Sequence, residues 1–200
     1  MVWSCLVSIL AQTEKLTDYV NPFVGTDGYG NVYPGAQIPF GGIQISPDTD
    51  SRFYDAASGY KYNHLTLMGF SLTHLSGTGI PDLGDFLFIP GTGEMKLEPG
   101  THEDPDQGYR SRYSHDKEWA SPNYYAVELA DYGVKAEMTS GVRSGMFRFT
   151  YPESDNAFIM IDMNHTLWQS CEWSNLRMIN DSTITGYKLV KGWGPERHVY

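Results

Sequence analysis

Apolar and polar residues alternate along three short runs of this chain, 125–129, 134–138 and 147–151. Alternation with a period of two is typical of a strand that buries one face and exposes the other. Turn residues separate the runs, Asp131-Tyr132-Gly133 and Ser140-Gly141, and they suit tight reversals of the chain. The segment therefore predicts three consecutive antiparallel strands, and no other feature constrains the fold as strongly.

The rest of the chain also predicts strands and turns rather than helices. No segment shows sustained apolar spacing of three and four residues, and no repeat of fixed period is present. Further strands are expected at Ile43-Gln44-Ile45, at 85–89 as a buried strand stopped by Pro90, at 158–161 as a more buried strand, at 183–190, and beginning at Val199-Tyr200. Residues 95–122 are the most polar stretch and predict a hairpin or an exposed loop. We predict an all-β, antiparallel β-sandwich.

Composition narrows the classes of function. The formal net charge is −10 and Lys and Arg form no cluster, so we expect no nucleic-acid partner. No apolar run reaches the roughly 18 residues that a membrane-spanning helix needs, so we expect no membrane span. The chain holds 5 Trp, 14 Tyr and 9 Phe, and such rings can stack on sugar rings. A plain β core explains the same counts, so composition alone leaves both interpretations open.

The N-terminus predicts an exported protein. Residues 1–11 form a short apolar segment that ends in the small residue Ala11, which resembles a secretory signal with its cleavage site. The basic start of such a signal is absent, so the segment is interpreted as a truncated signal peptide, with a buried N-terminal strand as the alternative. Residues 12–17 are then a polar lead, and 18–200 one domain. Cys5 and Cys171 form no CxxC pair and predict neither a zinc site nor a disulfide framework.

A glycine-rich segment at 25–35 carries the first candidate site. Its Gly-x-x-Gly-x-Gly spacing does not predict dinucleotide binding, because no strand-helix-strand pattern surrounds it. No Lys-Ser/Thr pair follows, so a phosphate loop is excluded as well. The segment can bring its backbone close to a ligand, or it can be a structural turn.

The second candidate site is the segment 74–85, which is rich in glycine and polar side chains. A Ser/His/Asp triad can be drawn on paper from His74, Ser76 and Asp82, but the sequence lacks the nucleophile elbow. An imidazole, hydroxyls and carboxylates on such a loop suit the recognition of sugar hydroxyls. The alternative is that they satisfy the backbone groups of their own turns.

Carboxylate pairs for acid–base chemistry are weak candidates in this chain. Glycoside hydrolysis needs one protonated acid and one base or nucleophile on either side of the scissile bond. The candidates by proximity are Asp82/Asp85, Asp50/Asp55 and Glu103/Asp104/Asp106. The last group lies among charges of both signs and predicts a solvated surface. The six histidines lack the spacing of a transition-metal site, so no metal ligands are assigned here.

Several short motifs, taken in order, resemble the opening of family 92 glycoside hydrolases. The resemblance covers residues 18–200 without a gap. The motifs are Val20-Asn21-Pro22-Phe23-Val24-Gly25-Thr26, Tyr33-Pro34-Gly35-Ala36, Pro39-Phe40-Gly41, Ser46-Pro47-Asp48-Thr49, Gly59-Tyr60, Gly69-Phe70-Ser71, Thr73-His74-Leu75-Ser76-Gly77-Thr78-Gly79, Asp82-Leu83-Gly84-Asp85, Gly192-Trp193 and Arg197-His198-Val199-Tyr200.

The resemblance implies a calcium-dependent, inverting exo-α-mannosidase, exported by bacteria to the periplasm, the cell surface or the medium. The expected partners are mannose-containing glycans such as N-glycans or mannan. Members of the family join a β-sandwich, similar to the galactose mutarotase supersandwich, to a C-terminal (α/α)6 barrel, with the active site between them. The general acid, the general base and most Ca²⁺ ligands are then expected in the barrel, so no catalytic residue is assigned within this chain. The chain is expected to be an N-terminal fragment with an incomplete sandwich.

The resemblance also implies that the loops at 27–33 and 74–82 form a wall of the sugar pocket. The residues expected to bind substrate are Asp27, Tyr29, Asn31, Tyr33, His74, Ser76, Thr78 and Asp82. The sequence departs from the family pattern at Asp27, Tyr29 and Val32, which leaves the linkage and the leaving group open. A stand-alone carbohydrate-binding sandwich without catalysis, or a structural β-domain, are the alternatives to the enzyme.

Overall fold

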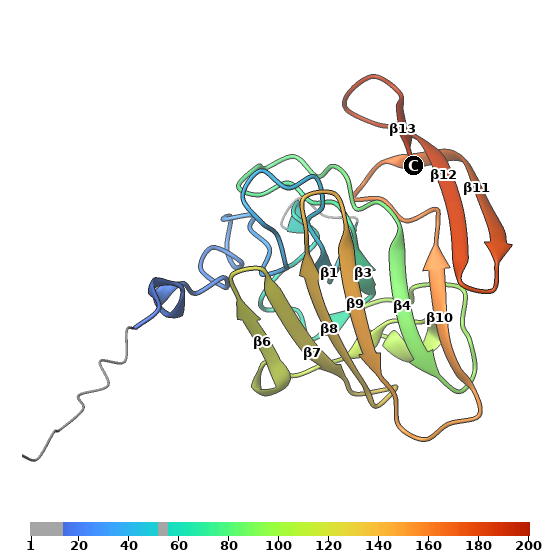
Figure 1. Cartoon of the computed structure of the whole chain (residues 1–200), viewed down its shortest axis with the longest axis horizontal. Coiled ribbons are helices and arrows are strands. Elements are labelled where there is room, and N and C mark those ends of the chain that lie inside the picture. The colour runs from blue at the N-terminus through green and yellow to red at the C-terminus, as the bar shows by residue number, and fades with distance from the viewer. Residues whose placement is uncertain (1–13, 52–55) are drawn as a thin grey trace, which may run out of the picture.

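The computed structural model describes residues 14–51 and 56–200, and the described chain is all-β, as predicted (Figure 1). The short 3-10 helices are η1 (Leu16–Tyr19), η3 (Pro105–Gln107) and η4 (His115–Lys117). The strands are β1 (Ser46–Asp48), β2 (Thr66–Leu67), β3 (Gly69–Ser71), β4 (Leu87–Thr92), β5 (Ser111–Arg112), β6 (Glu118–Ser121), β7 (Tyr124–Leu129), β8 (Val134–Ser140), β9 (Gly145–Thr150), β10 (Ala157–Asp162), β11 (Ser170–Asn180), β12 (Thr183–Lys191) and β13 (Arg197–Val199).

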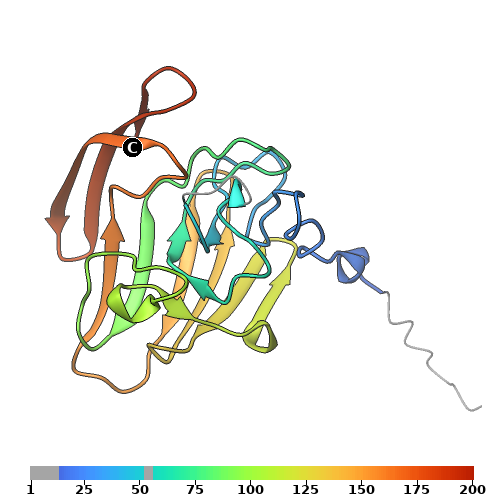
Figure 2. The same cartoon turned by 180° about the vertical axis from the view of Figure 1, so that it is seen from behind.

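Two four-stranded antiparallel sheets form the body of the sandwich. One has the strand order β1-β3-β4-β10 and the other the order β6-β7-β8-β9. The opposite views of Figures 1 and 2 show the second sheet on one side of the body and β1 and β3 on the other. The strands β7, β8 and β9 are the predicted meander, and their antiparallel register confirms it.

The core lies between these sheets. Val127 and Leu129 of β7 and Ala136 of β8 are buried against Phe70 of β3 and Ile45 just before β1. Each fully buried Val, Leu, Ile or Phe side chain contributes about 1.5–3 kcal/mol relative to an exposed one. The core therefore fixes the start of β1 and the end of β3, and the two glycine-rich segments of the sequence adjoin these points.

Two strands have other bounds than expected. The strand expected at 43–45 begins at Ser46, and Ile45 makes only an isolated bridge with Ala36. Pro90 does not stop its strand: β4 runs on to Thr92, because beyond Phe88 it has β10 beside it but no further pairing with β3. Pro lacks a backbone donor and is tolerated at such an edge.

Strand β10 was expected to be buried, yet Ile159 is 53% exposed. The strand is the last of its sheet in the described chain, so one of its edges has no neighbouring strand, and none of its residues is fully buried. Strand β11 was not predicted at all, because its apolar residues do not alternate. Strands β11, β12 and β13 make a separate sheet that projects from the body (Figure 1). The strand predicted at 183–190 is confirmed as β12.

The polar stretch 95–122 is more ordered than a hairpin or an exposed loop. It holds η3, β5, η4 and β6, and both Tyr109 and Tyr113 are buried in it. Their hydroxyls bond the side chain of Asp162 and the backbone carbonyl of His64, which lets polar groups enter the interior.

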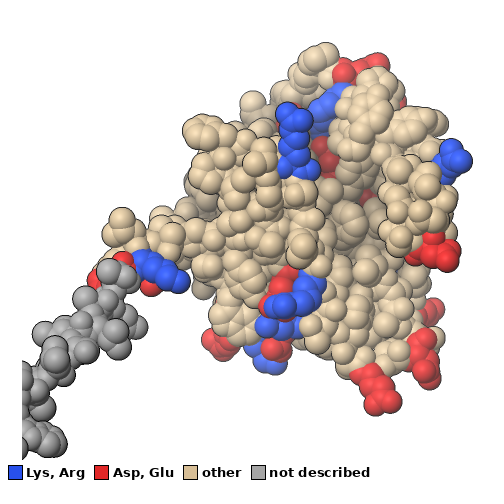
Figure 3. All heavy atoms as spheres, in the orientation of Figure 1, with Lys and Arg blue, Asp and Glu red and all other residues tan. Residues whose placement is uncertain are grey.

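Several predictions fall outside the described residues. The signal segment 1–11, Cys5, Asp55 and part of the polar lead 12–17 belong to these, so the structure does not test them. No helix in the described ranges is long and apolar enough to cross a bilayer. Lys and Arg side chains are scattered among acidic ones on the face seen in Figure 3.

Candidate functional site

The two glycine-rich loops lie side by side, although some forty residues separate them. The Gly77 amide donates a hydrogen bond of 2.7 Å to the Asn31 carbonyl. The Tyr33 and His74 rings are in contact, with centroids 5.0 Å apart. The Lys61 ammonium holds the same loop by donating to the Gly28 carbonyl. The loops at 27–33 and 74–82 thus form one surface, as a shared ligand site requires.

Asp27, Tyr29 and Ser76 are exposed on this surface, and Tyr29 is 91% exposed. Asp27 accepts a bond of 2.8 Å from the Gly28 amide through Oδ1. Asn31 has left-handed backbone with φ 50°. Its Nδ2 donates to the Tyr29 carbonyl, while its buried Oδ1 has no hydrogen-bond partner. Asp27, Ser76 and Tyr29 thus offer a carboxylate, hydroxyls and a ring to a ligand, whereas Asn31 Oδ1 lies just below the surface.

Tyr33 and His74 are buried beneath that surface. The Tyr33 hydroxyl donates to Gln37, and burial raises the pKa of Tyr33 above its ordinary value. His74 Nδ1 lies 2.7 Å from the Gln44 carbonyl, and its Nε2 lies 2.7 Å from Asp48 Oδ1 and 3.0 Å from Ser71 Oγ. The imidazole has no nitrogen left for a ligand, and neither Ser76 nor Asp82 is among these partners. A role for Tyr33 and His74 in substrate binding stays a prediction, and their contacts favour positioning of the loops.

Asp48 organises the buried side of the site. It is completely buried on β1, with His74 on one carboxylate oxygen and His165 Nε2 at 2.8 Å on the other. Burial alone would raise the pKa of Asp48, but the charge of His74 and the hydrogen bonds from both imidazoles outweigh it and hold that pKa well below its usual range. Gly59 covers the carboxylate: it has φ +84°, and a Cβ there would lie 2.1 Å from Asp48 Oδ1.

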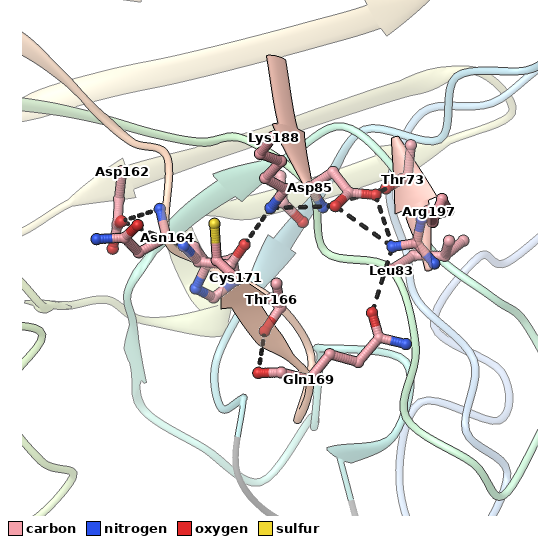
Figure 4. A network of polar contacts seen from close by, with 12 residues as sticks. Thr73, Leu83, Asp85, Asp162, Asn164, Thr166, Gln169, Cys171, Lys188 and Arg197 are labelled. Atoms are coloured by element: carbon pink, nitrogen blue, oxygen red, sulfur yellow. Dashed lines mark hydrogen bonds and ion pairs between the residues drawn. The ribbon is translucent and has the colours of Figure 1, made fainter. Parts of the chain in front are cut away.

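Asp82 leads into a chain of alternating charges, shown in part in Figure 4. Its Oδ1 accepts from Arg197 at 2.8 Å and from the Gln169 side chain. Arg197 also lies 3.1 Å from Asp85 Oδ2, and Asp85 Oδ1 lies 3.1 Å from Lys188. The Lys188 side chain is fully buried, and burial lowers its pKa. The negative charge of Asp85 acts to raise that pKa but does not outweigh the burial. The chain of charges ties β12 and β13 to the loop at 74–82.

Thr78 bonds within its own turn. Its hydroxyl donates to the Ile80 carbonyl at 2.8 Å and accepts from the Ile80 amide at 3.1 Å. Such bonds are those expected if the residue serves the turn rather than a ligand. A substrate contact by Thr78 stays a prediction.

The carboxylate candidates gain little support as an acid–base pair. Asp82 and Asp85 contact the same guanidinium, that of Arg197. Glu103 and Asp104 are exposed, and Asp106 is an exposed partner of Arg112. Within residues 14–51 and 56–200, no group of three or more His, Cys, Asp or Glu side chains is placed to hold a metal ion.

Sequence reasoning missed the residues that hold the site together: Asp48, His165, Gln169, Lys188 and Arg197. They come from segments up to 150 residues apart, so no spacing along the chain pairs them. Two of these residues could have been found from the motifs that carry the family resemblance, since Asp48 lies in Ser-Pro-Asp-Thr and Arg197 in Arg-His-Val-Tyr.

Comparison with solved structures finds close relatives of this fold. A structure described as the family GH92 alpha-mannosidase of Bacteroides thetaiotaomicron is 99% identical, with a TM-score of 0.92, over 94% of this chain and 26% of that chain. A family GH92 inverting mannosidase from Bacteroides thetaiotaomicron VPI-5482 is 24% identical, with a TM-score of 0.67, over 88% of this chain and 23% of that chain. The second likeness concerns the fold alone.

A curated relative and a family model agree with the motifs found in the sequence. An "Uncharacterized secreted glycosidase" of Arthroderma benhamiae is 30% identical over 150 residues, which are 74% of this chain and 19% of that protein. This chain thus spans about a fifth to a quarter of its relatives. The model of the glycosyl hydrolase family 92 N-terminal domain matches residues 19–200. Since that match takes in both loops and the charged network beneath them, the chain belongs to glycosyl hydrolase family 92 through its N-terminal domain.

Proposed function

We propose that the longer protein to which this chain corresponds hydrolyses terminal α-linked mannose from glycans, and that this chain supplies one wall of the sugar pocket. The observation that carries the proposal is the 99% identity to a structure described as an alpha-mannosidase. The wall consists of the loops at 27–33 and 74–82. The expected partners are mannose-containing glycans and the protein's own C-terminal barrel.

The proposed reaction is inversion by direct attack of water. A carboxylic acid protonates the glycosidic oxygen as the bond to the anomeric carbon breaks, and a carboxylate removes a proton from the water that attacks the opposite face. We assign both groups to the barrel, since this chain offers no convincing pair. The chain's own residues then bind and orient the sugar and exclude bulk water from one side.

Asn31 is the residue best prepared for that role. Its buried Oδ1 has no partner, which costs about 1–3 kcal/mol, and a shift of the loop that exposes this atom lets a sugar hydroxyl donate to it and remove the cost. Asp27 and Ser76 lie on the same surface and can accept from or donate to further hydroxyls. Asp82 has one oxygen committed to Arg197, and its other oxygen is the candidate contact.

Calcium dependence is part of the proposal, but the described residues do not fit a calcium site by themselves. The ligands are therefore assigned outside this chain, and no step here runs through the ion. We further propose export, since the fungal relative is called a secreted glycosidase.

Two measurements test the proposal. The full-length protein should release product from an aryl α-mannoside with calcium present, whereas purified 1–200 should release none above blank. In the full-length protein, Asp27→Ala, Asn31→Ala and Asp82→Ala should each lower kcat/KM by roughly 5- to 150-fold, the effect of one lost bond to a sugar hydroxyl. Glu103→Ala, in the exposed polar segment, is the matched control and should change little.

Melting temperature decides how these variants are interpreted. Loss of activity with an unchanged melt supports substrate contact, and a parallel loss of both assigns the residue to the scaffold. Wild-type kcat/KM in all three variants would refute the proposal that the two loops form a wall of the sugar pocket. Turnover by 1–200 that a single Asp or Glu substitution abolishes would refute the assignment of catalysis to the barrel.

A further inference from the structure

Two half-exposed tryptophans stack beside a cavity that the proposed site does not use. Trp168 is 47% exposed and Trp193 is 53% exposed. Their ring centroids lie 5.3 Å apart at an interplanar angle of 26°. Trp168 also lines a cavity of about 400 Å³, within the range of small-ligand sites. Large stacked rings left partly in water are typical of binding surfaces rather than of a core.

The backbone holds Trp168 in this position under strain. Its φ is +66°, a region that bulky residues rarely adopt. The preceding residue, Leu167, is completely buried and donates from its amide to the Leu83 carbonyl at 2.9 Å. Leu167 packs so closely on Gly84 that a Cβ there would lie 2.6 Å from Leu167 Cγ. Strain of this kind persists where the surroundings impose it, and it concentrates at ligand sites.

Polar groups line the same cavity. Asp162 accepts from the Tyr109 hydroxyl at 3.0 Å through Oδ2, and from the Asn164 and His165 amides at 2.8 and 3.2 Å through Oδ1. An ionised carboxylate offers about four acceptor positions, so these three donors leave capacity on Oδ2. The Asn164 side chain is exposed at the rim and offers both donors and an acceptor. A sugar ring has an apolar face that stacks on a flat aromatic ring, and hydroxyls at its edge that bond polar side chains. The cavity offers a partner for both.

We propose that Trp168, supported by Trp193, is a stacking platform for a pyranose ring of an α-linked oligosaccharide, with Asp162 and Asn164 bonding its hydroxyls. The inference rests on the proposed function for its ligand class. Gln169 lines this cavity and also donates to Asp82 of the candidate loops. The platform therefore adjoins the wall of the sugar pocket and takes a ring further along the glycan than the terminal mannose.

The test measures binding to the full-length protein by isothermal titration calorimetry. The probe is a sulfur-linked α-mannotriose, which resists hydrolysis. The informative variant is Trp168→Gly, because glycine accepts the left-handed backbone without strain and lacks the ring. We expect its Kd to rise roughly 5- to 20-fold, the effect of one lost aromatic contact and its buried area. Its melting temperature should equal or exceed that of the wild type.

Two further variants sharpen the result. Trp168→Phe keeps a ring and should recover most of the affinity. Trp119→Ala is the matched control. Trp119 is similarly exposed at 45%, but it lies on β6 in the sheet β6-β7-β8-β9 and does not line the cavity. It should leave Kd unchanged.

Unchanged affinity in Trp168→Gly would overturn the platform, as would failure of the wild type to bind the probe. A drop in melting temperature that accompanies the loss would also overturn it, because the pair would then serve packing. Mannose release from ordinary α-mannotriose tests the proposed function separately. Hydrolysis with unaltered binding in Trp168→Gly refutes only the platform, whereas altered binding without any hydrolysis refutes only the mannosidase.

Discussion

Replacement of Asp48 by asparagine removes the charge at the centre of the buried side of the site. His74 has a carbonyl at Nδ1 and the carboxylate at Nε2, and both are acceptors while Asp48 is ionised. The ionised Asp48 therefore accepts from His74 on one oxygen and from His165 on the other, so two imidazole hydrogen bonds hold the buried carboxylate. Asp48→Asn keeps the shape and one acceptor but loses the charge.

The size of the effect follows from this burial. A hydrogen bond to a charged group contributes about 1.5–3 kcal/mol, and Asp48→Asn loses the charge from two such bonds while it keeps one acceptor, so we expect a loss of about 2–4 kcal/mol. A loss of about 3 kcal/mol lowers the melting temperature of a domain of this size by about 6–12 °C. Urea unfolding of 1–200, followed by circular dichroism, measures the difference in free energy of unfolding. Asp106→Asn makes the same chemical change in an exposed ion pair with Arg112 and should have no measurable effect.

The pH dependence gives the effect a sign. The pKa of Asp48 lies lower in the folded chain than its ordinary value of 3.8, so its stabilisation is complete above that value. It is lost as the pH falls through the folded-state pKa. The difference between wild type and Asp48→Asn should therefore be full at about pH 7 and smaller at about pH 3. A difference below about 1 kcal/mol at neutral pH, or one that does not shrink in acid, would refute the stabilising role of the buried carboxylate.

Two further predictions concern the residues around this centre. Gly59→Ala should destabilise the chain far more than Gly77→Ala in urea unfolding. Both glycines have positive φ, but the new Cβ meets Asp48 at Gly59, whereas nothing lies within 4 Å of it at Gly77. Equal losses of stability would contradict this difference in packing. Burial lowers the pKa of Lys188 below 10.5, so the wild-type fold gains stability as the pH rises from about 7 towards about 10. Lys188→Met lacks this gain and should lose stability relative to wild type over the same interval. A difference in free energy of unfolding that does not depend on pH would contradict this.

The sequence was sufficient for the fold class because the relevant signal is local. The alternation along 125–151 predicts β7, β8 and β9, since their strands pair with immediate neighbours and share one core. The same local rule failed at β11, which has no buried residue on either face and so no alternation, and at Pro90, where the position of β10 decides what proline can do.

The candidate loops were also found from sequence, because glycine and small polar residues mark them directly. Which of their residues are free to bind a ligand became clear only from the tertiary structure. Asn31 and His74 look equally able to meet a sugar in the sequence, yet Asn31 Oδ1 has no partner and His74 has all its nitrogens occupied. Hydrogen-bond satisfaction is a property of neighbours, and those neighbours come from other strands.

Family membership, the all-β class and the two loops were therefore determined by the sequence, through motifs and periodicities of a few residues. Only the tertiary structure decided that Asp48 lies between His74 and His165, that Arg197 links Asp82 to Asp85, and that Trp168 projects beside a cavity. The physical reason is that charges, buried acceptors and exposed rings acquire their energies from what surrounds them, and here those surroundings are assembled from both ends of the domain.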